Sequence, residues 1–120
     1  MSRDYRHLRV FVDADALVID IYQSTRDFPA SERYGLSLQM RRAAVSVPAN
    51  LVEGSARRST KEFVNFVNIA AGSAAEVRYL AQLAMRLGFL PEQDATRLAA
   101  AYTIVCAKLG ALMRSLQDKP

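Results

Sequence analysis

The basic residues of this chain gather in one segment. Positions 33 to 61 hold six lysines and arginines against a single acid, Glu53, so the segment carries +5. The net charge of +4 leaves −1 for the rest of the chain. Most of these residues are arginines, whose planar guanidinium groups bind phosphate or carboxylate through two parallel hydrogen bonds. The sequence therefore predicts a nucleic-acid-binding surface, and an ordinary solvated helix face is the alternative. The predicted nucleic-acid-binding residues are Arg41, Arg42, Arg57, Arg58 and Lys61.

Side chains that could carry catalysis or hold a metal are sparse. His7 is the only histidine, so neither a histidine-based triad nor a multi-histidine metal site can be assembled. Asp13 and Asp20 share a helix face but lack the Glu-x-x-His spacing of di-metal bundles. The five glycines form no phosphate-binding loop. Cys106 lies on an apolar helix face and is predicted to be a core residue. We expect no enzyme, cofactor, metal or small-molecule substrate.

Four helical segments are expected to position these residues, at about 8–25, 32–55, 60–87 and 91–117. Ser59 and Glu62 have the spacing of a capping box at the start of the third segment. Gly88 ends that segment as a left-handed cap, and Pro91 suits the first turn of the fourth. The short connections predict that consecutive helices run antiparallel. The expected fold is all-α, a single up-down-up-down four-helix bundle over residues 1–120.

The second helix has two apolar faces. One stripe, which includes Leu36, Met40 and Val47, is expected to enter the bundle core. A second stripe lies on the opposite side, and the third helix also carries apolar residues away from its core face. Scattered surface hydrophobic residues are the alternative, but coincident stripes on adjacent helices favour burial between copies of the chain. The predicted homo-oligomer interface consists of Leu38, Val45, Val52, Ile69 and Leu80.

The second helix contains a proline and an asparagine whose unfavourable effects on a buried helix must be offset by contacts with their surroundings. Pro48 removes one backbone hydrogen bond and costs about 3 kcal/mol in a helix interior. We expect packing between helices and between copies to offset that cost. Asn50, at the margin of the core stripe, is predicted to hydrogen-bond a neighbouring helix, because a buried amide needs partners.

The composition also indicates a cellular compartment. The start of the chain lacks the pattern of a signal peptide, and no run approaches the ~20 apolar residues of a membrane span. The single cysteine cannot form an internal disulfide. We therefore expect a cytoplasmic protein that does not enter a membrane.

Several motifs of the chain resemble those of one known family. The longest is Gly35-Leu36-x-x-Gln39-x-Arg41-Arg42-Ala43-x-x-Ser46-Val47-Pro48-x-Asn50-x-x-Glu53-Gly54. Others are Arg58-Ser59-x-Lys61-Glu62-Phe63, Ala71-Gly72-Ser73-x-x-Glu76 and Arg86-Leu87-Gly88-Phe89-Leu90. Together they resemble the signature of the 23S rRNA intervening-sequence proteins over nearly the whole chain. The resemblance implies a small bacterial four-helix bundle that assembles as a homopentamer. It also implies similarity to the pentameric, nucleic-acid-associated accessory proteins of diversity-generating retroelements.

Two functions remain open from the sequence. The preferred hypothesis is a non-enzymatic homo-oligomer that binds nucleic acid, RNA or DNA and most of all RNA, through its arginine-rich surface. The alternative is a protein-interaction scaffold whose arginines form salt bridges between subunits, with Glu53 or Glu76 as partners. Glu53 and Arg57 are also spaced as an i,i+4 ion pair within one helix. The two functions differ in whether the arginines are exposed or paired.

Overall fold

The computed structural model describes residues 4–118, so the ends of the predicted 1–120 domain lie outside the described residues. Over this range the chain folds into four long helices and two short 3-10 helices, without any β-strand. The elements are η1 Tyr5–His7, α1 Arg9–Ser24, η2 Ala30–Glu32, α2 Leu36–Ser55, α3 Thr60–Arg86 and α4 Glu92–Gln117.

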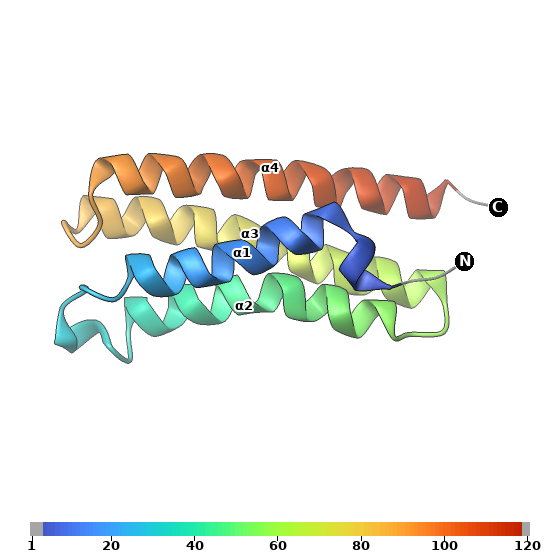
Figure 1. Cartoon of the computed structure of the whole chain (residues 1–120), viewed down its shortest axis with the longest axis horizontal. Coiled ribbons are helices and arrows are strands. Elements are labelled where there is room, and N and C mark those ends of the chain that lie inside the picture. The colour runs from blue at the N-terminus through green and yellow to red at the C-terminus, as the bar shows by residue number, and fades with distance from the viewer. Residues whose placement is uncertain (1–3, 119–120) are drawn as a thin grey trace.

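The four long helices lie side by side along one axis of a molecule that measures 49 × 23 × 19 Å (Figure 1). The α1–α2 and α3–α4 connections lie at one end of the bundle, and the α2–α3 turn lies at the other (Figure 1). α3 packs extensively along both α2 and α4, whereas α1 packs mainly on α2 and meets α4 over fewer residues. The neighbouring helices α2 and α3, with the turn between them, carry all five predicted basic contacts.

α2 begins four residues later than the sequence predicted. A 3-10 helix and a turn occupy residues 30–35, and α2 starts at Leu36. Glu32 explains the difference, because its carboxylate accepts a hydrogen bond from the Leu36 backbone N–H at 3.0 Å and so caps the helix from outside it. A Cβ on Gly35 would lie 2.9 Å from the Glu32 Oε1. Gly35 therefore leaves room for the capping carboxylate.

The ends of α3 match their predicted signals, while the start of α4 is shifted by one residue. The Ser59 side chain accepts a hydrogen bond from the Glu62 backbone N–H at 3.1 Å. Gly88 has φ 79°, and the backbone N–H groups of Gly88 and Phe89 bond the carbonyls of Met85 and Ala84. This is the paired bonding of a Schellman motif. Pro91 precedes the first residue of α4 as its N-cap instead of lying within the first turn.

Pro48 is buried within α2, and the polar residues near it are bonded. The Asn50 amide donates to the Ser46 backbone carbonyl at 2.7 Å and to the Ser46 hydroxyl at 2.9 Å. The predicted bond from Asn50 to a neighbouring helix is therefore wrong, because its own helix supplies the acceptor. The link to α3 passes instead through Ser46, whose hydroxyl lies 2.8 Å from that of Ser73.

The core is filled by large side chains from all four helices. The largest fully buried ones include Tyr102, Ile21, Met40, Leu51, Leu98 and Leu109. The Tyr102 hydroxyl is buried without a hydrogen-bond partner among the described residues. Burial, with a smaller contribution from the charge of Asp20, raises the pKa of Tyr102 above its ordinary value. Tyr102 therefore acts as a large apolar residue with one unpaired polar atom.

Ion pairs connect α1 to α4, the two adjacent long helices that contact each other over the fewest residues. Asp20 accepts hydrogen bonds from Arg97, and Asp13 accepts one from Lys108. The hydrogen bond with Asp20 raises the pKa of the Arg97 guanidinium. The two aspartates that share a face of α1 thus hold α4.

Among residues 4–118, α4 is the one helix long and apolar enough to cross a membrane, judged by length and composition alone. Counting consecutive apolar residues in the sequence did not identify it. This property does not distinguish a membrane span from a bundle helix, and α4 packs along α3.

Candidate nucleic-acid interface

Three of the five predicted basic residues lie at the α2–α3 turn. Gly54, the last residue but one of α2, lets the helices approach each other there. A Cβ at that position would lie 2.7 Å from the Phe66 Cβ, which is closer than real contacts allow. Ser59 then starts α3 by capping its first turn. The close crossing and the cap fix a short turn that carries Arg57 and Arg58 and is followed at once by Lys61.

Arg57 is partly engaged within its own chain. Its Nη2 donates to the Glu53 carboxylate at 2.9 Å, so the predicted i,i+4 pair is present. Its guanidinium also lies over the Phe66 ring, 5.0 Å from the ring centre. These contacts hold the Arg57 side chain against α3 and partly neutralise its charge.

Arg58 and Lys61 are the available charges of the turn. Both side chains are exposed, and neither forms an ion pair with any residue between 4 and 118. Glu62 is exposed beside them and reduces the local positive charge. The N-terminus of α3 adds partial positive charge at the same place, since helix dipoles are positive at that end. The turn can therefore bind a phosphate group through two unpaired cations.

Arg41 does not belong to this exposed surface. Its Nε donates to the Thr25 hydroxyl at 2.9 Å, and its Nη2 donates to the Tyr22 carbonyl at 3.3 Å. The guanidinium also lies over the Tyr22 ring, 4.5 Å from the ring centre. The end of α1 thus occupies two of the Arg41 donors and makes this arginine less available than predicted, while its role as a nucleic-acid contact stays a prediction.

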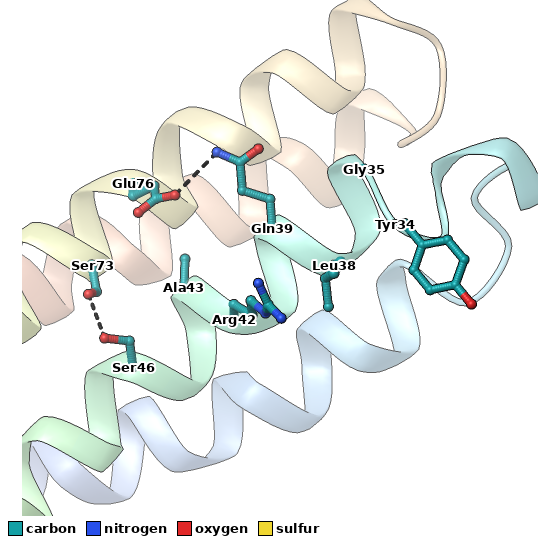
Figure 2. Close-up of a pocket in the computed structure, with 9 residues that line it drawn as sticks. All are labelled: Tyr34, Gly35, Leu38, Gln39, Arg42, Ala43, Ser46, Ser73 and Glu76. Carbon is teal, nitrogen blue, oxygen red and sulfur yellow. Dashed lines mark hydrogen bonds between the residues drawn. The ribbon is translucent and has the colours of Figure 1, made fainter.

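Arg42 lies at a groove between α2 and α3. The groove has a volume of ≈ 400 Å³ and is lined by Tyr34, Gly35, Leu38, Gln39, Arg42, Ala43, Ser46, Ser73 and Glu76 (Figure 2). The Gln39 amide donates to the Glu76 carboxylate at 3.4 Å, and the two serines bond each other across the helices (Figure 2). Arg42 is exposed, and it forms no side-chain hydrogen bond or ion pair with the described residues.

The groove was not predicted from the sequence as a site. The sequence feature that could have indicated the groove is a set of polar residues on two separate helices, namely Gln39, Ser46, Ser73 and Glu76. These positions become neighbours only once α2 and α3 are aligned with each other.

The structure does not bring the five basic residues together. Arg57 lies fifteen positions after Arg42, which corresponds to about 22 Å along a helix axis. Arg41 faces α1, Arg42 faces the groove, and the other three lie at the turn. The predicted single arginine-rich surface therefore divides into three environments.

Most of the predicted outer stripe is accessible in the single chain. Val45, Val52 and Ile69 are 39%, 37% and 50% exposed, and Leu38 is half-buried. Leu80 is only 2% exposed and belongs to the core, so its assignment to a subunit interface is wrong. α3 packs along both α2 and α4. These two neighbours cover more of the surface of α3 than the single core-facing stripe of the sequence prediction would.

The remaining candidate reactive groups lie apart from one another. Cys106 is half-buried and packs against the core. His7 is exposed, and its Nε2 lies 3.9 Å from the Asp4 carboxylate. Within residues 4–118, no group of three or more histidine, cysteine, aspartate or glutamate side chains is arranged to hold a metal ion.

Comparisons with known proteins agree with the sequence motifs. A family model described as 23S rRNA-intervening sequence protein matches residues 6–111. A solved structure of a protein of unknown function from the S23 ribosomal protein family of Bacteroides thetaiotaomicron is similar, with a TM-score of 0.80 and 21% identity. The similarity covers 88% of this chain and 95% of that one and, at this identity, shows the fold alone. No curated protein matches the chain. Because the family match spans most of its length, this chain belongs to the 23S rRNA-intervening sequence protein family.

Proposed function

We propose that this protein is a non-enzymatic, cytoplasmic homo-oligomer that binds RNA through the α2–α3 turn, with Arg58 and Lys61 as its principal contacts. The observation that carries the proposal is that both cations are exposed and unpaired within the described chain. The family description refers to ribosomal RNA, which makes RNA the first ligand to test. The pentameric state implied by the resemblance, and the likeness to retroelement accessory proteins, are part of the same proposal.

Self-assembly would increase the number of cations that one RNA strand can contact. A single turn offers few phosphate contacts, since Arg57 is paired with Glu53 and Glu62 lies nearby. Several copies would repeat the unpaired cations and let one strand contact more than one turn. Each phosphate that is neutralised releases counterions, so the binding should depend strongly on salt.

The expected binding has little sequence preference. Sequence-specific recognition of single strands relies on aromatic side chains that stack on bases. The turn from Ser55 to Lys61 contains no aromatic residue, and the Phe66 ring beside it is engaged by Arg57. Contacts at the turn would therefore be made mainly to the RNA backbone.

The test is a gel-shift titration of a single-stranded RNA at several salt concentrations. The parent is compared with an Arg58→Ala, Lys61→Ala variant and with an Arg26→Ala, Arg86→Ala control. The control removes two exposed arginines, one just after α1 and one at the last residue of α3. The α1–α2 and α3–α4 connections that follow these helix ends lie at the opposite end of the bundle from the α2–α3 turn (Figure 1). On single strands each lost contact should reduce the slope of log K against log salt by roughly 0.7. We expect that reduction only in the turn variant.

Two results would overturn the proposal. One is a parent that binds neither RNA nor DNA at low salt. The other is a turn variant whose affinity and slope equal those of the control. In that case a scaffold function, in which the basic residues contact protein, would replace it.

A further inference from the structure

A polar pocket lies between the end of α1 and the start of α2. It has a volume of ≈ 310 Å³, and three of the residues that line it are arginines, Arg26, Arg33 and Arg41. No acidic residue of the described chain lines it. A concave site that holds charge of one sign concentrates ions of the opposite sign, so this pocket should attract anions.

The charges of Arg26 and Arg33 are not neutralised within the chain. Both side chains are exposed, and neither forms an ion pair with any residue between 4 and 118. Asp27 and Glu32 are the neighbouring acids in the sequence, but neither lines the pocket. The Glu32 carboxylate already accepts a hydrogen bond from the Leu36 backbone N–H. The arginine charges therefore remain available to an anion.

Arg41 is held beside the pocket by the end of α1. Its hydrogen bonds to the Thr25 hydroxyl and the Tyr22 carbonyl use two of the five N–H groups of the guanidinium. The other N–H groups form no hydrogen bond within the described residues. A side chain that is already fixed loses little conformational freedom when it binds a ligand. Arg41 is thus a preorganised donor for an anion.

Ser37 adds an independent indication of a ligand. This residue is only 7% exposed, and it lines the pocket. Its hydroxyl forms no hydrogen bond with another residue of the described chain, although polar groups of buried residues are normally bonded. Ser37 also belongs to the first turn of α2, where the positive end of the helix dipole favours anions. An unused hydroxyl donor therefore lies where an anion would be most stable.

We propose that this α1–α2 pocket binds a phosphate group, as free phosphate or as part of a small phosphorylated molecule, with Ser37, Arg33 and Arg41 as its contacts. A phosphate monoester carries about −1.5 to −2 charge at neutral pH and matches three cations better than one carboxylate does. Its oxygens accept several charge-assisted hydrogen bonds at once, which suits guanidinium and hydroxyl donors together. Phe28 and Pro29 line the same pocket and can contact the organic part of a monoester.

This site is separate from the proposed RNA contact. The α1–α2 connection lies at the opposite end of the bundle from the α2–α3 turn (Figure 1). The phosphate ligand would therefore bind independently of the turn, and either site can fail without the other.

The experiment is calorimetric titration of the full chain with inorganic phosphate, ribose 5-phosphate and unphosphorylated ribose. We expect one site per chain for the phosphates and none for ribose. Tighter binding of ribose 5-phosphate would assign the pocket to phosphate monoesters, and equal or tighter binding of inorganic phosphate would assign it to free phosphate. Either result supports the proposal.

Two variants test the named contacts. Ser37→Ala should weaken phosphate binding by about tenfold or more, because it removes a hydrogen bond to a charged group. Arg33→Gln should weaken it by about fivefold, since an exposed charge is partly screened by water. Arg86→Gln is the matched control, an exposed arginine of α3 outside the pocket, and should bind as the parent does. Thermal melts establish that the variants are folded, and the exposed Arg33 provides a test even if Ser37→Ala is unstable.

Three results would overturn the inference. One is a parent that binds neither phosphate probe at millimolar concentration. Another is unchanged affinity in both Ser37→Ala and Arg33→Gln. The third is displacement of ribose 5-phosphate by a single-stranded RNA that lacks a terminal phosphate, because the pocket would then be part of the RNA-binding surface.

Discussion

The Nε of Arg41 donates to the Thr25 hydroxyl at 2.9 Å, which ties the second turn of α2 to the C-cap of α1. The next residue, Arg42, makes no such contact and lines the α2–α3 groove. Successive residues on a helix point about 100° apart, so two adjacent arginines are directed to different neighbours. The double arginine therefore places one side chain in an internal contact and the other, exposed, at the groove.

Arg41→Ala should lower the stability of the fold without changing RNA binding. The substitution removes two hydrogen bonds and the contact with the Tyr22 ring. A loss of about 1–2 kcal/mol is expected from these contacts. Denaturant unfolding measures the loss, and the gel-shift salt slope should match that of the parent. A variant with unchanged stability and a reduced slope would place Arg41 among the phosphate contacts.

Gly54→Ala should destabilise the bundle because its methyl group has no space. The added Cβ would lie 2.7 Å from the Phe66 Cβ and 2.9 Å from the Phe63 ring. The α2–α3 crossing must open to relieve this overlap, at a cost of about 1–3 kcal/mol. A lower midpoint of urea unfolding is the expected measurement.

Gly72→Ala is the matched control for this substitution. Gly72 also lies inside a helix, but apart from the adjoining backbone of that helix and its two chain neighbours no described atom lies within 4 Å of an added Cβ. Alanine at that position should stabilise α3 by about 0.4–1 kcal/mol, because it restricts the unfolded chain. If both variants were equally destabilised, close packing at Gly54 would not be the cause.

Tyr102→Phe should leave the fold as stable as the parent or stabilise it by about 1 kcal/mol. The hydroxyl that it removes is buried without a partner in the described chain, and such a group costs free energy to desolvate. Thermal unfolding at neutral pH measures the difference. A large destabilisation would indicate that the hydroxyl has a partner in the assembled protein.

The same residue gives the fold a dependence on alkaline pH. Burial raises the pKa of Tyr102 in the folded chain, while the unfolded phenol keeps its ordinary value of 10.0. Above pH 10 the unfolded state ionises and the folded state does not, so stability falls as pH rises. Tyr102→Phe lacks this term, and the Tm of the parent should fall more steeply than that of the variant above pH 10. Parallel curves would contradict the assignment.

The sequence predicted the helices well where a local signal exists. Ser59 and Gly88 mark the two ends of α3 through backbone geometry that depends on neighbouring residues alone. The start of α2 was missed because Glu32 caps it from a separate 3-10 helix, and its spacing to Leu36 is not that of a capping box. Local patterns predict an element reliably when its capping contacts are themselves local.

The candidate site was harder to predict because it depends on contacts between helices. Counting charges found the basic segment, but it could not show that Thr25 and Tyr22 occupy Arg41. It also could not show that Arg42 and Glu76 line one groove, since they lie 34 positions apart on different helices. The number of arginines in a segment can be counted from the sequence. Which of those arginines remain free to bind a ligand depends on how the neighbouring helices pack around them.

Val45→Glu should disrupt self-assembly while leaving the single-chain fold intact. Val45 is 39% exposed on the outer side of α2, so an isolated chain can hold a glutamate there in contact with water. Between two copies the same carboxylate would be buried without a partner, at a cost of several kcal/mol. Light scattering should show a multimer for the parent and smaller species for the variant, with helical content unchanged. Val12→Glu is the control, because Val12 is also exposed but lies on α1, away from the α2–α3 face. Equal dissociation by both substitutions would remove Val45 from the interface, because the effect would then not depend on where the charge is placed. A Val45→Glu monomer that loses helical content would also remove it, because the substitution would then damage the fold itself.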